Sequence, residues 1–114
     1  MMTISISALL HGIESGKLQF SDVIAFIDNN HTYTRTKFQN GELVNEAGVN
    51  ENSAKVFSLA KQHGLNQSDT LKLFAEHYQS VLNNPDGTDH ANIRNFMHYG
   101  WQGFHMSTNA ILAR

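Results

Sequence analysis

The sequence predicts an α+β fold that is mostly helical, with about five helices and a small antiparallel β-hairpin or three-stranded sheet. Apolar residues recur with the 3.6-residue period of amphipathic helices through most of the chain. Residues 31–45 break that period, are rich in residues that favour extended structure, and contain an Asn-Gly turn signal. At 114 residues the chain has the length of one domain, so we expect a single domain over residues 1–114.

Two helices are predicted near the N-terminus. The first carries four apolar residues on one face, at i, i+3, i+4 and i+7: Ile6, Leu9, Leu10 and Ile13. Gly12 and Gly16 indicate that this helix ends near them. Ser21 is a candidate N-cap for the second helix, which the pair Asn29-Asn30 closes.

The break in the helical period predicts a hairpin. Residues 31–38 alternate large side chains and form the first strand. Asn40-Gly41 is a strong turn signal because both turn positions take positive φ, and residues 42–45 form the return strand. Two short strands alone are marginally stable, so we expect a third strand, for which residues 103–107 are the candidate.

The third and fourth helices follow the hairpin. Asn50 or Ser53 caps the third helix, which Gly64 stops at its C-terminus. Asn66 begins a fourth helix through a capping-box pattern. Its apolar stripe is the clearest in the chain and runs to Leu82, which is expected to face the core.

The fifth helix is predicted to begin at Thr88 and to end at Gly100. Asp86 and Asp89 lie at its N-terminal end, where a carboxylate complements the helix macrodipole and caps free N–H groups. Residues 107–114 carry weak signals and are expected to fray.

The composition excludes several classes of function. The chain carries 8 Lys and Arg against 10 Asp and Glu, and the basic residues are scattered, which argues against nucleic-acid binding. The lack of cysteine excludes disulfides and thiolate metal sites. No apolar run approaches the length of a membrane span. The N-terminus lacks charged residues until Glu14, as bacterial type III export signals often do, but a plain helix start is the favoured interpretation.

Residues 45–55 and 85–104 are the two unusual polar segments of the chain, and we expect them to form one surface. The second contains the only Pro, the only Trp and an Asp-Gly turn. The first, extended back to the hairpin turn, concentrates polar residues of restricted type: Asn40, Asn45, Glu46, Asn50, Glu51, Asn52 and Lys55. Surface turns seldom need such density, whereas a buried polar network does.

The two segments supply the candidate site residues. The candidate catalytic residues are the charged ones Glu46, Glu51, Asp89, His90 and Arg94. The carboxylates would act as bases or ligands, the histidine as a proton shuttle, and the arginine as a bidentate anion clamp. The candidate metal ligands are Glu51, Asp89 and His90. The candidate ligand-binding residues are Asn45, Asn50, Lys55, Asn92 and Trp101.

Several candidates also have an ordinary structural explanation. Glu51 and Lys55 have the i, i+4 spacing of a surface ion pair. Asp89 and His90 are adjacent and would diverge on a helix, so each would need a partner from elsewhere.

Two more candidates and the other histidines have structural alternatives as well. Arg94 could pair with Glu46 or Glu51 as an interior tie, which would leave no ligand site there. Trp101, between two glycines, is interpreted as a core plug at the end of the last helix, with a stacking platform for a ligand as the alternative. Four histidines are interpreted as helix ends or solvated surface: His63, His77, His98 and His105.

Two long motifs in the same order carry a resemblance to a known family. Residues 40–55 read NGELVNEAGVNENSAK and residues 85–97 read PDGTDHANIRNFM, followed by GWQGF. The chain resembles the HopJ type III effector protein family from about Phe26 to Phe104. Asn52 stands where the family pattern usually has Gly, and Ala54 where it usually has Cys. If that Cys is a small packing residue, Ala replaces it in kind.

The resemblance implies a small bacterial protein with a single HopJ-like domain, in a family named for plant-pathogen effectors. It implies a type III effector-like protein that acts through binding, with a host or bacterial protein as its partner. The alternative is a small cytoplasmic ligand- or metal-binding protein or an enzyme, which would use the Glu, Asp, His and Arg side chains as a polar pocket. The expected localisation is cytoplasmic, or a host cell after type III secretion. The family pattern assigns no activity, cofactor or catalytic residue.

Overall fold

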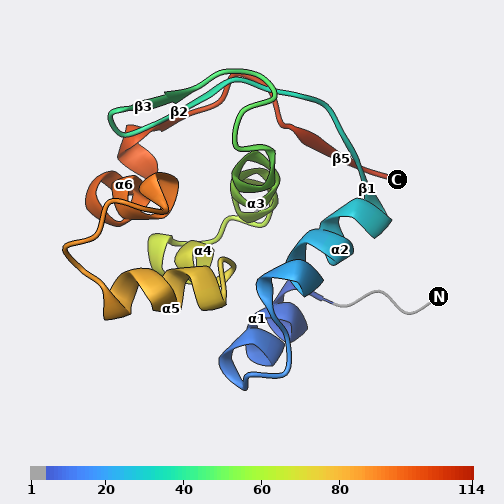
Figure 1. Ribbon diagram of the computed structural model, residues 1–114. Helices are drawn as coiled ribbons and strands as arrows, with labels where there is room; N and C mark the ends of the chain where they lie inside the picture. Colours follow the sequence, from blue (N-terminus) through green and yellow to red (C-terminus); the bar gives the residue numbers. More distant parts are fainter. Residues whose placement is uncertain (1–4) are drawn as a thin grey trace.

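The computed structural model describes residues 5–114, which fold into six α-helices, one 3-10 helix and five short strands (Figure 1). The helices are α1 (Ile6–Glu14), α2 (Phe20–Asn30), α3 (Glu51–Gln62), α4 (Gln67–Lys72), α5 (Glu76–Asn83), α6 (Ala91–Tyr99) and the 3-10 helix η1 (Gly100–Gly103). The strands are β1 (His31–Tyr33), β2 (Phe38–Asn40), β3 (Leu43–Asn45), β4 (Phe104–His105) and β5 (Ile111–Ala113). The prediction of a mostly helical α+β fold is confirmed.

The first two helices begin close to where the sequence places them. α1 begins after Ser5, whose hydroxyl accepts a hydrogen bond from the first turn at 3.1 Å. α2 begins at Phe20, so the prediction of Ser21 as its N-cap is wrong. The N-cap is Gln19, whose backbone N–H donates to the Asp22 carboxylate at 2.8 Å. That carboxylate, three residues on, fixes the start of the helix two residues earlier than predicted.

The predicted hairpin and its third strand are confirmed, because β2 pairs antiparallel with both β3 and β4. The turn differs from the prediction. Asn40 pairs with Leu43, so Gly41 and Glu42 form the two-residue loop, and of these Gly41 takes the positive φ of 62°. A glycine at the first loop position suits a type II′ turn. Asn40 therefore belongs to the strand, and its side chain is fully buried.

A second sheet joins β1 to β5 and was not expected from the sequence. His31–Tyr33 pairs with Ile111–Ala113 instead of continuing into the hairpin. The expectation that residues 107–114 fray is wrong, since Ile111 has no exposed surface. Strands of three residues carry too little alternation to be recognised, and these two lie far apart in the sequence.

The single helix expected to run to Leu82 is two helices, α4 and α5, which point in different directions (Figure 1). Ala75, between them, has φ 53° and ψ −124°, far from helical values. The break leaves Leu82 45% exposed, although the sequence predicts a core position for it. α6 begins at Ala91 rather than near Thr88.

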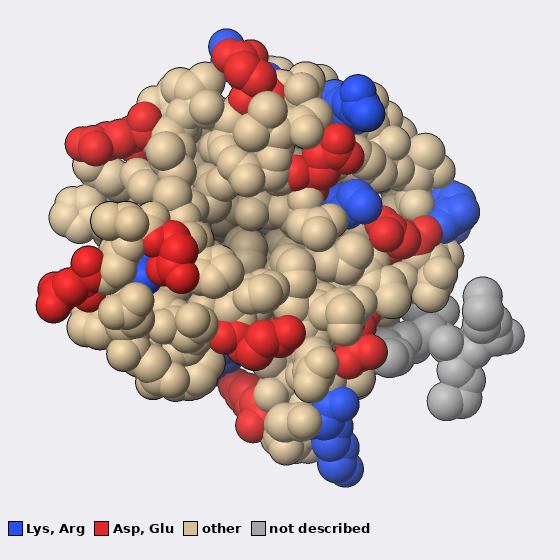
Figure 2. Space-filling model, viewed as in Figure 1, with Lys and Arg blue, Asp and Glu red and all other residues tan. Residues whose placement is uncertain are grey.

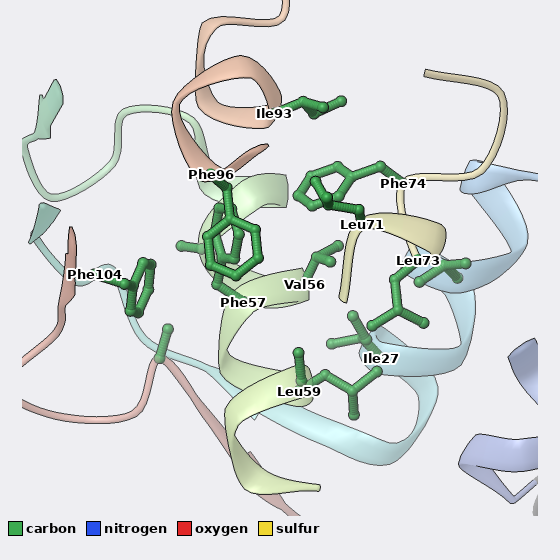
Figure 3. Packing of buried hydrophobic residues seen from close by; sticks show 14 of the residues in the cluster. Ile27, Val56, Phe57, Leu59, Leu71, Leu73, Phe74, Ile93, Phe96 and Phe104 are labelled. Carbon is green, nitrogen blue, oxygen red and sulfur yellow. The ribbon is translucent and has the colours of Figure 1, made fainter. Parts of the chain in front are cut away.

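Helix α3 lies between α6 and α2 and supplies the centre of the core (Figures 1 and 3). Phe57 of α3 packs against Phe74, Phe96 and Phe104, with ring centroids 5.0 to 5.3 Å apart. These rings come from four different parts of the chain, so the core fixes α3 against α6 and the three-stranded sheet. Among residues 5–114, no helix is both long and apolar enough to cross a membrane.

Candidate functional site

The two polar segments meet in one pocket at the starts of α3 and α6. The pocket has a volume of about 510 Å³. It is lined by residues from α2, α3, α5, α6 and the breaks before them: Phe20, Asn50, Glu51, Asn52, Ser53, Phe74, His77, His90, Ala91, Asn92 and Ile93. Figure 2 shows a hollow near the middle of the face between α6 and α2, with uncharged residues inside it and charged residues around it.

Both α3 and α6 begin from a residue in the left-handed conformation. Asn50 has φ 54° and ψ 50°, and His90 has φ 52° and ψ 47°. Asn and His are among the non-glycine residues that adopt this region most readily. Within the described chain, neither side chain caps its own helix. Residues of the first turns of both helices line the pocket, and the N-cap side chains leave the backbone N–H groups of these turns unengaged.

Four asparagines connect the sheet to both helix starts. Asn92 Oδ1 accepts hydrogen bonds from the side chains of Asn40 at 3.0 Å and Asn45 at 3.1 Å. Asn45 Oδ1 accepts from Asn92 at 3.1 Å and from Asn50 at 2.7 Å. The side chains of Asn40, Asn45 and Asn92 are buried, so these bonds replace contacts with water. Asn45 does not line the pocket, but it holds Asn50 and Asn92, which do.

Two imidazoles lie in contact within the pocket. The ring centroids of His77 and His90 are 5.0 Å apart, with their planes tilted by 36°. His77 also makes an edge contact with the Phe20 ring at 4.7 Å, and Phe20 stacks on Phe74 at 6.0 Å. The histidine pair thus borders an aromatic wall. Imidazole nitrogens can donate or accept hydrogen bonds and exchange protons with a bound molecule.

Asp89 and Arg94 shape the loop before α6 and do not line the pocket. Arg94 Nη2 donates to Asp89 Oδ1 at 2.8 Å, its Nε to the Asp89 carbonyl at 2.6 Å, and its Nη1 to the Pro85 carbonyl at 3.3 Å. The hydrogen bond from Arg94 holds the pKa of the Asp89 carboxyl below its usual range. Because these donors bond within the loop, Arg94 positions the loop, and its guanidinium does not point a free pair of N–H groups at an anion in the pocket.

Asp89 and His90 do not diverge as the sequence predicts. Asp89 Oδ2 lies 3.9 Å from His90 Nε2. The expectation assumed that both residues belong to one helix, whereas His90 precedes α6 in the left-handed conformation. The loop therefore turns the imidazole into the pocket while the carboxylate stays 60% exposed beside it.

The two glutamates of the first segment have other partners than Arg94. Glu51 lines the pocket, and its Oε1 lies 3.5 Å from Arg35 Nε. Glu46 Oε1 lies outside the pocket, 3.8 Å from Lys37 Nζ. The buried ion pair between Arg94 and either glutamate, which the sequence left open as an alternative, is thus not formed in the described chain.

Lys55 and Trp101 also lie away from the pocket. Lys55 Nζ contacts Asp28 Oδ1 at 2.9 Å and sits 4.9 Å from the centre of the Tyr33 ring, so the predicted pair with Glu51 is replaced. Trp101 packs edge-on against core phenylalanines, and its Nε1 donates to a backbone carbonyl of the α3–α4 connection at 2.9 Å. This geometry agrees with the interpretation of Trp101 as a core plug.

The three candidate metal ligands are not gathered into one group in the part of the chain that the structure describes. Of the pocket residues, Glu51 and His90 come from different helix starts, and Asp89 is held by Arg94. Among residues 5–114, no group of three or more His, Asp or Glu side chains is placed to hold a metal ion. The pocket instead presents imidazoles, amides, a hydroxyl and one carboxylate.

Sequence reasoning missed His77, Phe20 and Phe74 as pocket residues. The sequence indicates a helix end or a solvated surface for His77, and the predicted fourth helix runs straight through it. The break at Ala75 places His77 in the first turn of α5 instead, where it faces His90. A periodic apolar pattern carries no signal for such a break, because it continues in phase on both sides.

Comparison with known proteins agrees with this fold. The family model described as HopJ type III effector protein matches residues 6–111. The crystal structure of an unknown function protein, VPA0580, is similar, with a TM-score of 0.88 and 34% sequence identity over 99% of this chain and 97% of that chain. No curated protein matches the chain.

Proposed function

The chain belongs to the HopJ type III effector protein family, and from that premise we propose that it acts by binding a small molecule in the pocket between the starts of α3 and α6. The observation that carries this proposal is the meeting of the two polar segments around a contacting pair of histidines. The convergence of these segments on one hollow is what a binding site requires.

The lining of the pocket supports this proposal. Its volume of about 510 Å³ lies in the range typical of small-molecule sites. Phe20 and Phe74 provide an apolar wall, and His77, His90 and Ser53 provide polar groups that can fix the orientation of a ligand. The asparagine network sets the two helix starts before any ligand arrives, which reduces the entropic cost of binding.

A thermal-shift panel of sugars, nucleotides, phosphates and organic acids tests the proposal on the purified protein. A ligand present at about 100 times its Kd adds about 2.7 kcal/mol to the free energy of unfolding. For a domain of this size, the melting temperature should rise by roughly 10 °C or more. A panel in which no compound shifts the melting temperature contradicts the proposal.

A matched pair of variants localises any hit. Asn52→Trp places an indole at the mouth of the pocket, and we expect it to abolish the shift. Asn83→Trp makes the same change at the exposed end of α5, outside the pocket, and should leave the shift intact. Equal effects of the two variants would place the ligand elsewhere on the protein.

The family description supports a second part of the proposal, that the chain acts inside a host cell after delivery by a type III secretion system. A host protein would then be a partner, or the bound molecule would come from the host. A translocation reporter fused after Arg114 tests this part. We expect a signal in host cells that requires an intact secretion system; a signal independent of that system, or none, contradicts it.

A further inference from the structure

We propose that the ligand of this pocket is a small organic anion, whose oxyanion group is bound by protonated His77 and His90 and whose apolar part lies on Phe20 and Phe74. This inference rests on the proposed function and names the ligand class of the same site. It follows from what the two imidazoles contact and from how the carboxylates around them are engaged.

The first step concerns the charge that the pair can carry. Imidazole is the side chain that takes up a proton as the pH falls from 8 to 5. Two protonated rings with centroids 5.0 Å apart repel each other. An oxyanion that accepts a hydrogen bond from both rings removes this repulsion, so anion binding and proton uptake favour each other.

The second step concerns the carboxylates of the elements around the pair. Glu51 of α3 lies beside Arg35, and Asp89 of the preceding loop is bound by Arg94 of α6. Glu76 of α5 accepts a hydrogen bond from the first backbone N–H of α2 at 2.7 Å. Each of these acidic groups thus has a partner, and the second carboxylate oxygen of Asp89 lies 3.9 Å from His90 Nε2. His77 and His90 are the titratable groups of the pocket lining besides Glu51.

The third step concerns the rest of the ligand. Phe20 touches His77 edge-on and stacks on Phe74, so an aromatic wall begins where the imidazoles end. A molecule that presents an anionic group to the histidines therefore places its remaining atoms against apolar surface. The first turns of α3 and α6, whose N–H groups no N-cap side chain engages in the described chain, contribute residues to the same hollow.

Sulfate and phenyl phosphate are the probes of choice, measured by calorimetry at pH 5.5 and pH 8. Sulfate keeps its charge across this range, so a change in its affinity reports titration of the protein alone. We expect sulfate to bind at least about tenfold more tightly at pH 5.5, because imidazole side chains take up protons as the pH falls through this range. Phenyl phosphate should bind more tightly than inorganic phosphate, because only it reaches the aromatic wall.

Three variants attribute the effect to the pocket. His77→Gln and His90→Asn should each weaken sulfate binding about tenfold at pH 5.5 and remove most of the pH dependence. Asn is chosen at position 90 because it tolerates the left-handed conformation that His90 adopts. His98→Gln, on α6 but outside the pocket, is the control and should bind sulfate as the wild type does. Circular dichroism confirms that each variant is folded.

Several outcomes would overturn the inference. Sulfate binding that is equal at both pH values, or unchanged in His77→Gln and His90→Asn, excludes the histidine pair as the anion site. Equal affinity for phenyl phosphate and inorganic phosphate would mean that the aromatic wall contributes nothing to binding, and it excludes an organic anion as the preferred ligand. If benzyl alcohol binds and Asn52→Trp blocks it while no anion binds, the proposed function stands and this inference is wrong. If nothing binds, both are wrong.

Discussion

At the scale of single residues, the asparagines show how burial decides what one side chain does. Asn66 caps α4 by accepting a hydrogen bond from the Asp69 backbone at 2.8 Å, as the sequence indicates. Asn40 and Asn92 are buried and bond to each other instead. The local sequence around Asn40 favours a turn equally well. Its role in the network depends on α6, which lies far away in the sequence.

The network predicts a large stability loss when Asn92 is truncated. Asn92→Ala leaves the buried amides of Asn40 and Asn45 short of partners, so we expect the free energy of unfolding to fall by about 2–3 kcal/mol. Urea denaturation measures it. Asn83→Ala, at an exposed position, should change stability by less than about 0.5 kcal/mol. Equal losses in the two variants would mean that the buried hydrogen bonds contribute little.

We expect the ion pair between Asp89 and Arg94 to stabilise the fold at neutral pH but not at strongly acid pH. The folded-state pKa of Asp89 is held below the unfolded value, mainly by the Arg94 hydrogen bond. The ion pair therefore stabilises the fold above the unfolded pKa of about 3.9, and this contribution is lost as the pH falls through the lower folded pKa. We expect wild type to melt above Asp89→Asn at pH 7, with the gap closing below about pH 4. A gap that stays constant down to pH 2.5 would contradict this role.

At the scale of elements, three helices begin immediately after a non-glycine residue with positive φ. These residues are Asn50 before α3, Ala75 before α5 and His90 before α6. The first turn of each of these helices contributes to the pocket. Backbone strain persists where surrounding structure imposes it and concentrates at functional sites. The pocket is thus framed by helix starts that local propensity alone would not favour.

A substitution at Ala75 tests whether its positive φ strains the backbone. Ala75→Gly removes the penalty for φ 53°, so we expect the free energy of unfolding to rise by about 1 kcal/mol. The same change in the middle of a helix, Ala60→Gly in α3, should lower it by at least about 1 kcal/mol. Thermal and urea unfolding measure both. A destabilised Ala75→Gly variant would mean that its methyl group contributes more than the strain costs.

At the scale of the whole molecule, the sequence predicts features that are local and misses those that depend on distant pairing. The helical stripes and the β2–β3 hairpin lie within short windows, and their patterns predict them. The break at Ala75 and the inward position of His77 depend on packing against α2 and α6. Residue density predicts the meeting of the two polar segments. The ion-pair partners of Arg94 and Glu46, which are Asp89 and Lys37, cannot be read from spacing.

Substitutions in the C-terminal strand β5 test whether a feature that depends on distant pairing stabilises the fold. β5 pairs with β1, which directly follows α2, and the Ile111 carbonyl accepts a hydrogen bond from the Gln62 side chain at 2.7 Å. Ile111 is fully buried, whereas its neighbour Leu112 is 64% exposed. Ile111→Ala should therefore cost about 2–5 kcal/mol in urea unfolding, and Leu112→Ala less than about 0.5 kcal/mol.

The comparison isolates burial, because both substitutions shorten an aliphatic side chain in the same short strand. A frayed C-terminus, as the weak local pattern suggests, would make the two variants equally stable. A large difference would mean that the last strand folds with the core. The sheet formed by β1 and β5 would then be part of one cooperative unit with α3, through Gln62 and the buried face of β5.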